Sequence, residues 1–186
     1  MAPLRARLAS RNAHKLHELR AALPGWELEL LETSEPIPEE EGASYYENAR
    51  AKADFGRRVG EEDVWTLGED SGIEVAALGG RPGIASARWA EDGVAALLEV
   101  LAGVSDRRAR YVCELVALFP DGEERRATGI LEGAIATERR GDEGFGYDPI
   151  FVPDGEERTV AELGDAWKRE SSHRARAAAA LRLHRP

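Results

Sequence analysis

The sequence contains only one cysteine, Cys113, so an intrachain disulfide is excluded. This residue lies in the apolar segment Tyr-Val-Cys-Glu-Leu-Val-Ala-Leu-Phe, where core packing is its expected role. The N-terminal residues lack the continuous apolar stretch of a secretory signal, and no apolar run approaches membrane-spanning length. These absences predict a soluble, cytoplasmic protein.

Lysine is also scarce: Lys15, Lys52 and Lys168 are the only lysines among 25 lysine and arginine residues. Each lies inside a compact polar motif. A lysine ammonium on its flexible stem suits a point contact to a phosphate or carbonyl oxygen, whereas arginine serves elsewhere as general surface charge. The pattern indicates that lysine is required at these positions, with chance in an arginine-rich composition as the alternative.

Positive charge is deficient overall, because the formal net charge is -10. This balance argues against sequence-independent binding to nucleic acid and against anionic membranes. An anionic small molecule could bind only where basic side chains converge or a divalent cation offsets the carboxylates. The 186 residues suit one well-buried domain, expected to cover 1–186, with room for two lobes.

The order of apolar and polar residues predicts a mixed α/β protein. Strands are expected at Leu4–Ala9, Trp26–Leu31, Val64–Leu67, Ala109–Phe119 and Arg125–Ile135, the last two as a hairpin, and the chain can continue extended over Ile73–Leu78. Helices are expected at His14–Leu23, Ser44–Val59 and Asp92–Ala102, then after the cap Thr159 and after Ser171.

The motif Ser10-Arg11-Asn12-Ala13-His14-Lys15 joins the first expected strand to a helix N-terminus. Free backbone N–H groups and the helix dipole attract phosphate there, and Lys15 could clamp a phosphate oxygen. A plain capping turn is the alternative. In the next expected helix, Asn48 and Lys52 share one face and can therefore act together.

Glu69-Asp70-Ser71-Gly72 places two adjacent carboxylates at an expected strand end. Gly72 would let the chain turn and bring them to the mouth of a cleft. Adjacent strand side chains point to opposite faces, so one carboxylate is expected to face the chemistry and the other to support it. An acidic surface turn is the alternative.

A second carboxylate group, Glu39-Glu40-Glu41, precedes Gly42. Alone it is typical of a solvated charge run. Together with Asp70 and substrate phosphates it predicts a magnesium site, because Mg²⁺ takes few protein carboxylates and keeps water and phosphate ligands. The spacing does not choose among the three glutamates.

The loop Phe145-Gly146-Tyr147-Asp148 combines an aromatic ring, a glycine and a carboxylate, which suits stacking on a base and hydrogen bonding to its edge. A tight turn around a core phenylalanine is the alternative. Lys168 and Ser172-His173-Arg174 could donate to base carbonyl oxygens. His173 alone would suit an ordinary helix cap.

Together these motifs resemble the inosine/xanthosine triphosphate pyrophosphatases, the RdgB-like family that removes non-standard purine nucleotides. The resemblance spans nearly the whole chain, and eight motifs in family order are far more specific than any one of them. They are Ser10-x-Asn12-x-x-Lys15, Glu40-x-Gly42, Glu47-Asn-Ala-x-x-Lys52-Ala, Asp70-Ser-Gly, Leu78-Gly-Gly-x-Pro-Gly83, Ser86-Ala-Arg88, Gly144-Phe-Gly-Tyr-Asp-Pro-Ile-Phe151 and Ser172-His-Arg174.

The resemblance implies a homodimeric, Mg²⁺-dependent enzyme that hydrolyses ITP, dITP or XTP to the monophosphate and pyrophosphate. It implies an elongated, mixed, twisted sheet with flanking helices and two lobes around a nucleotide-binding cleft. Asp70 takes the position of the catalytic base and, with Glu40, of a metal ligand. The implied substrate-binding residues are Ser10, Arg11, Asn12, Ala13, His14, Lys15, Lys52 and Ser71 for the phosphates and sugar, and Phe145, Gly146, Tyr147, Asp148, Lys168, His173 and Arg174 for the base.

The sequence departs from the family pattern at Glu69, where a second aspartate is common. The extra methylene should move the carboxylate outward and alter metal geometry or pH dependence, while the Asp70 role remains. Ser171 replaces an apolar residue, which should affect packing. Two other functions stay open: a pyrophosphatase for other modified or pyrimidine nucleotides, and a nucleotide-binding regulator without catalysis.

Overall fold

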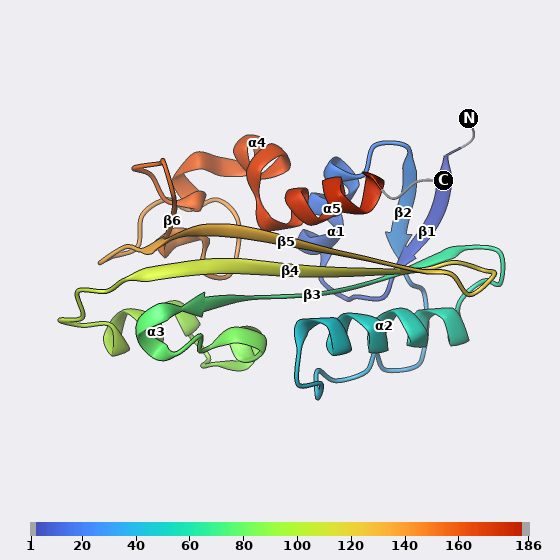
Figure 1. Cartoon of the computed structure of the whole chain (residues 1–186), viewed down its shortest axis with the longest axis horizontal. Coiled ribbons are helices and arrows are strands. Elements are labelled where there is room, and N and C mark those ends of the chain that lie inside the picture. Colours follow the sequence, from blue (N-terminus) through green and yellow to red (C-terminus); the bar gives the residue numbers. More distant parts are fainter. Residues whose placement is uncertain (1–2, 184–186) are drawn as a thin grey trace. The chain divides into compact units, whose positions relative to one another are not determined.

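The computed structural model describes residues 3–183 and contains an open, mixed six-stranded sheet with flanking helices (Figure 1). The strands are β1 (Leu4–Leu8), β2 (Trp26–Leu30), β3 (Trp65–Val75), β4 (Arg108–Leu118), β5 (Glu124–Ile135) and β6 (Phe151–Pro153). Their order is β2-β1-β3-β4-β5-β6. β1 is parallel to β2 and β3, whereas β6 is antiparallel to β5. The predicted mixed α/β fold and the β4–β5 hairpin are therefore confirmed.

Over residues 3–183, five α-helices follow the predicted ones closely. They are α1 (Ala13–Ala22), α2 (Tyr45–Val59), α3 (Gly93–Val100), α4 (Val160–Ser171) and α5 (His173–Leu183), with short 3₁₀ turns at Ala76–Leu78, Gly83–Arg88 and Asp148–Ile150. Thr159 and Glu162 form the predicted capping box at the start of α4. Within the described part of the chain, no helix has the length and apolar character needed to cross a membrane.

The predicted strand end near Gly72 is wrong. β3 continues without a turn through Glu69, Asp70, Ser71 and Gly72 to Val75. β1 pairs with the first residues of β3, Trp65 to Leu67, and β4 is the neighbour of β3 on the other side. The two carboxylates therefore lie inside a strand rather than at the tip of a loop.

The chain divides into two compact units, each described separately below. The first comprises the chain up to Asp70, Cys113–Gly129 and the chain from Arg174 onward, and the second comprises Ser71–Val112 and Ile130–His173. Neither unit is one continuous stretch of sequence. The single domain over 1–186 stays a prediction.

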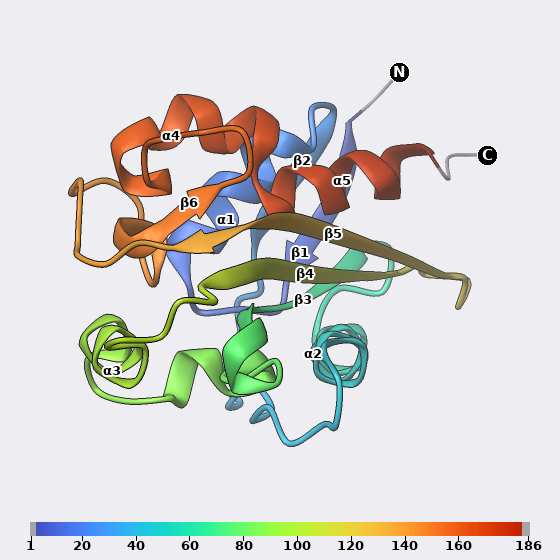
Figure 2. The ribbon, with the colours of Figure 1, turned by 60° about the vertical axis from the view of Figure 1, so that its left-hand side comes forward.

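In the first unit, alternate residues of β4 face two different layers. Cys113, Leu115 and Ala117 pack in the core cluster that includes α1 and α5. Val116 and Leu118 pack instead with α2. Figures 1 and 2 show α2 on one side of these strands and α1 with α5 on the other. Because Cys113 is fully buried among these side chains, its predicted packing role is confirmed.

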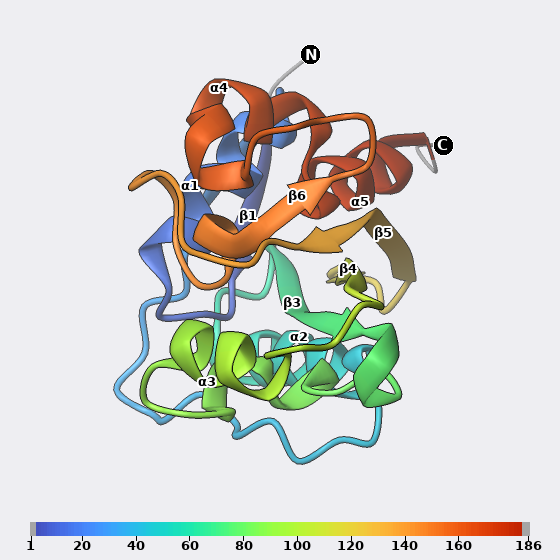
Figure 3. The same ribbon diagram turned by 90° about the vertical axis from the view of Figure 1, so that its left-hand side faces the viewer.

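The second unit has one continuous apolar core that includes Ile73, Leu97, Tyr111, Ile150 and Phe151. Figure 3 shows α3 and α4 on opposite sides of its strands. Tyr111 comes from β4, and its ring lies 4.6 Å from that of Phe151. This core supports the loop that precedes β6, which carries the predicted base-binding motif.

Candidate active site

Asp70 lies near the middle of β3 and its carboxylate points toward α2. The Asn48 side-chain amide donates a hydrogen bond to Asp70 at 2.9 Å, and the Lys52 ammonium lies 3.6 Å from the other carboxylate oxygen. Lys52 also donates to the Glu69 backbone carbonyl at 3.0 Å. The predicted shared helix face thus brings Asn48 and Lys52 to one buried carboxylate.

The charges around Asp70 shift its protonation. Burial raises the pKa of Asp70 to about 6; Lys52 opposes this rise, and Glu40 adds to it. Burial by itself would lower the pKa of Lys52, but Asp70, Glu69 and Glu40 outweigh it and raise that pKa above its usual value. A carboxylate with a pKa near neutral pH, held beside a lysine that stays charged, suits general-base chemistry.

Glu40 is the member of the acidic run that reaches this cluster. Its carboxylate contacts the Lys52 ammonium, whereas Glu39 and Glu41 are exposed. Burial would raise the pKa of Glu40, but Lys52 lowers it, so this carboxylate is held charged. Asn48 anchors the same loop by accepting a hydrogen bond from the Gly42 N–H at 2.8 Å. Of the three glutamates that sequence spacing left equal, Glu40 is thus the one that contacts Lys52, and metal binding by it stays a prediction.

The approach of α2 to β3 requires a glycine at position 68. A Cβ atom there would lie 1.8 Å from the Ala49 carbonyl oxygen and 2.7 Å from the Ala53 nitrogen. Both are backbone atoms of α2. This close contact is what sets the helix against the strand two residues before Asp70.

Glu69 points to the opposite face of β3, as the alternation of strand side chains predicts. Its carboxylate lies 2.6 Å from the Lys15 ammonium and accepts a hydrogen bond from Arg174 at 3.0 Å. Burial would raise the pKa of Glu69, but Lys15, Arg174 and Lys52 hold it well below the usual range. The longer side chain therefore serves an ion-pair cluster on the other face of the strand from Asp70.

Glu18 completes this second cluster and was not predicted. Arg174 is 4% exposed and its guanidinium also lies 3.2 Å from the Glu18 carboxylate. Glu18 sits between Leu16 and Leu19 on the buried face of α1. The sequence signal that could have identified it is a glutamate on the apolar face of a helix, which requires a buried cation as its partner. Base contact by Arg174 stays a prediction, because the structure directs this side chain to two carboxylates of the first unit.

The loop from Ser10 to Lys15 forms the cap of α1. The Asn12 side chain accepts hydrogen bonds from the His14 and Lys15 N–H groups at 2.9 and 3.3 Å. Ser10 in turn accepts one from the Asn12 N–H at 3.1 Å, while Arg11, Ala13 and His14 are exposed. The capping turn is thus present, and phosphate binding by this loop stays a prediction.

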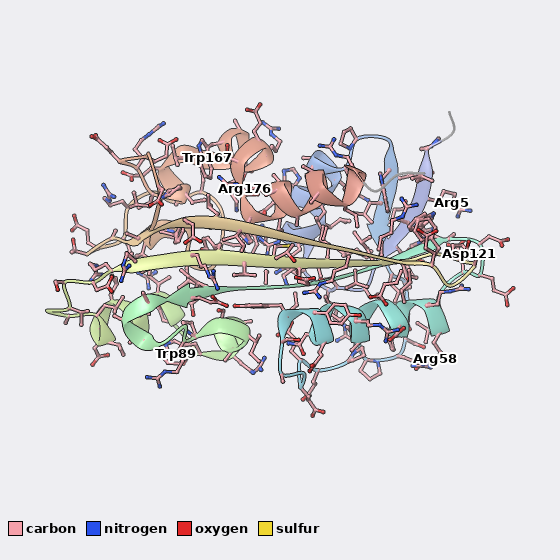
Figure 4. The ribbon with its side chains drawn as sticks, in the orientation of Figure 1. Arg5, Arg58, Trp89, Asp121, Trp167 and Arg176 are labelled. Carbon is pink, nitrogen blue, oxygen red and sulfur yellow. The ribbon has the colours of Figure 1, made fainter. Side chains whose placement is uncertain are left out.

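The three lysines contrast with the surface arginines. Arg5 and Arg58, labelled in Figure 4, pair with exposed glutamates at 2.9 Å and have more than half of their side chains exposed. The side chains of Lys15, Lys52 and Lys168 are 15%, 9% and 4% exposed, and each pairs with a buried or half-buried carboxylate. All three lysines therefore lie in largely buried polar surroundings, and their contact with phosphate or a base stays a prediction.

A separate polar cluster surrounds Asp148 in the second unit. Lys168 lies 2.7 Å from one carboxylate oxygen, which also accepts a hydrogen bond from the Phe145 N–H at 2.9 Å. The other oxygen accepts one from the Tyr111 hydroxyl at 3.2 Å. The Lys168 ammonium lies 4.7 Å from the centre of the Phe145 ring. His173 belongs to this unit as well and stacks on Tyr111.

The loop before β6 is shaped by Gly144 and Tyr147. Gly144 has φ 78°, and a Cβ there would lie 2.3 Å from the Asp148 carboxylate. The Tyr147 hydroxyl donates to the Ser86 carbonyl at 2.9 Å, and burial raises the pKa of Tyr147 to about 12. Gly146 is exposed, and Ser71 is half-buried in β3.

The fold and these clusters define an α/β protein with an open mixed sheet, in which buried carboxylates are matched by lysines and arginine. Residues 6–184 match the Ham1 family, and the chain belongs to this family. The resemblance drawn from the motifs is thereby confirmed.

Similar proteins carry a more specific name. A dITP/XTP pyrophosphatase of Mycobacterium tuberculosis is 46% identical over 189 residues, covering 94% of this chain and 91% of that protein. A dITP/XTP pyrophosphatase of Deinococcus deserti is 43% identical over 181 residues, covering 94% and 86%. The solved structure of the Staphylococcus aureus Ham1 protein is 33% identical with a TM-score of 0.83 over 96% of each chain.

Proposed function

We propose that this protein hydrolyses the non-standard purine nucleoside triphosphates ITP, dITP and XTP to the monophosphate and pyrophosphate, and so cleanses the nucleotide pool. The observation that carries the proposal is the buried Asp70 carboxylate held by Asn48 and Lys52, with Glu40 on the same lysine. The name shared by the similar proteins supports the same reaction.

Asp70 and Glu40 fit a Mg²⁺ ion by the chemistry of their donors. Both carboxylates lie at a single ammonium, so hard anionic oxygens converge at one position. Within residues 3–183, no three His, Cys, Asp or Glu side chains form a metal-binding group. Two carboxylates with water and substrate phosphates suit Mg²⁺, which when bound would offset phosphate charge.

Asp70 is the proposed base. Its carboxylate would orient a water molecule and accept its proton as the water oxygen attacks the α phosphorus and the bond to the β-phosphate oxygen breaks. Lys52 and Lys15 would neutralise phosphate charge, with the loop Ser10–Lys15 and Ser71 holding the phosphates and sugar. Positioning and charge neutralisation supply most of the catalysis in such reactions.

The cluster around Asp148 suits a 6-oxopurine. Hypoxanthine and xanthine present a carbonyl oxygen at position 6 and an N–H at position 1, which match the Lys168 ammonium as donor and the Asp148 carboxylate as acceptor. Adenine instead presents an amino donor at position 6 and a ring-nitrogen acceptor at position 1, so both pairings are lost. Phe145 would stack on the base, and His173 lies on the ring that supports Asp148. Discrimination against adenine would arise from donors and acceptors left unpaired.

A nucleotide panel tests this function. ITP, dITP and XTP should be hydrolysed with kcat/KM above those for ATP, GTP and dTTP, by a factor approaching about 10⁴ over ATP. Guanine shares the groups at positions 1 and 6 with hypoxanthine, so the preference over GTP must arise at position 2. Phosphate should appear only when inorganic pyrophosphatase is added, which separates cleavage at the α phosphorus from release of the terminal phosphate. Equal hydrolysis of ATP would contradict the base pocket, and a preference for dTTP would favour a pyrimidine substrate.

The assignment of Glu40 as metal ligand predicts a shifted magnesium requirement. Glu40→Gln should need about tenfold more Mg²⁺ for half-maximal ITP hydrolysis, because an anionic ligand is lost. Glu39→Gln is the matched control and should behave as the wild type, since this side chain is exposed one residue away. Magnesium titrations of both variants check the result. Equal shifts in the two would remove Glu40 from the metal site.

A homodimer in the cytoplasm, without a nucleic-acid or membrane partner, completes the proposal. The family resemblance supports the dimer, and the net charge of -10 disfavours nucleic-acid and anionic membrane surfaces. Size-exclusion chromatography with light scattering gives the oligomeric state directly.

A further inference from the structure

Tyr111 connects the parts of the base-binding cluster, and no motif of the sequence identified it. It lies on β4 and is 7% exposed. Its hydroxyl donates a hydrogen bond to one Asp148 carboxylate oxygen at 3.2 Å, while Lys168 and the Phe145 N–H donate to the other oxygen. Asp148 is therefore held from three sides, and Tyr111 is the only one of these donors that comes from the sheet.

The Tyr111 ring is itself fixed by two neighbours. It lies 4.5 Å from the His173 ring, with the planes 9° apart, and 4.6 Å from the Phe151 ring in the core. Phe151 is fully buried. A ring that packs against two other rings is restricted in its movement and holds its hydroxyl in place, so the bond to Asp148 restricts rotation of that carboxylate.

We propose that Tyr111 is a positioning residue for purine selection, acting through Asp148. This inference rests on the proposed function. When both oxygens of the carboxylate accept hydrogen bonds from the protein, the carboxylate is already oriented before the base binds. It can then accept from the N–H at position 1 without a further loss of conformational entropy. Loss of the Tyr111 hydroxyl frees one oxygen to turn, and the distinction between 6-oxopurines and adenine weakens.

Tyr111→Phe isolates the hydroxyl, because the phenyl ring keeps the contacts with His173 and Phe151. The ratio of kcat/KM for ITP to that for ATP should fall about 3- to 10-fold, as expected for one lost hydrogen bond. The change should appear mainly in the KM for ITP. Tyr46→Phe is the matched control, since it removes a tyrosine bond to the Glu124 carboxylate at 2.7 Å in the first unit. Its ratio should equal that of the wild type.

Calorimetric binding of IMP and AMP repeats the comparison without turnover, and thermal unfolding reports the stability of each variant. Tyr111→Phe should lose affinity for IMP and keep that for AMP. An unchanged ITP-to-ATP ratio, with or without a lower unfolding midpoint, would give Tyr111 a packing role and refute the inference alone. A wild-type protein with no preference for ITP would instead refute the proposed function and this inference together.

Discussion

Asp70→Asn is expected to lower the turnover of ITP about 10²- to 10⁴-fold, the usual contribution of a general base. Asparagine keeps the size of the side chain and an oxygen that can accept from Asn48, but it cannot take a proton from water. Steady-state rates at saturating Mg²⁺, with a parallel measurement of nucleotide affinity, check the result. Affinity should change far less than turnover.

The control for this variant is Asp54→Asn on the exposed side of α2. Asp54 pairs with Arg50 at the surface, so the same chemical change should leave turnover intact. Turnover of Asp70→Asn close to the wild-type value would exclude Asp70 as the base. The reaction would then need another proton acceptor.

Gly68→Ala is expected to destabilise the protein by about 3 kcal/mol, at the upper end of overpacking effects. The added Cβ would meet the Ala49 carbonyl oxygen at 1.8 Å, and a backbone atom cannot move aside as a flexible side chain can. Helix α2 must shift away from β3, which also disturbs Lys52. The midpoint of urea unfolding, followed by tryptophan fluorescence, measures the loss.

Gly56→Ala provides the same substitution with the opposite expectation. A Cβ at Gly56 would meet Thr66 at 3.4 Å and Ala9 at 3.5 Å, which are close to ordinary contacts. Gly56 lies inside α2, where alanine is favoured by up to about 1 kcal/mol. Gly68→Ala with wild-type stability would mean that the spacing between α2 and β3 is not tightly fixed.

Local patterns predicted the elements and part of the candidate site. The four-residue separation of Asn48 and Lys52 is enough to put both on one helix face, and strand alternation is enough to separate Glu69 from Asp70. Residue spacing does not record the path of a loop. Spacing therefore left Glu39, Glu40 and Glu41 equal; the family resemblance favoured Glu40, and the structure places Glu40 at Lys52.

The remaining differences come from tertiary packing. Glycine after two acids suggested a turn at Gly72, but β3 stays extended through this residue beside β4, so its place in the sheet overrides that preference. Tyr111 reads as an ordinary strand residue until the loop carrying Asp148 is placed against it. Arg174 sits in a motif associated with the base, yet its neighbours are Glu18 and Glu69, which are distant in sequence.

The side-chain amide of Asn48 hydrogen-bonds to both the acidic loop and β3. Its oxygen accepts from Gly42 and its nitrogen donates to Asp70. Aspartate at this position would place a second negative charge beside Asp70. Leucine would leave both the Gly42 N–H and the Asp70 carboxylate without this hydrogen bond. A substitution at position 48 therefore requires compensating substitutions in the loop at Gly42 and in β3 at Asp70. We expect these three positions to change slowly during evolution, and to change together.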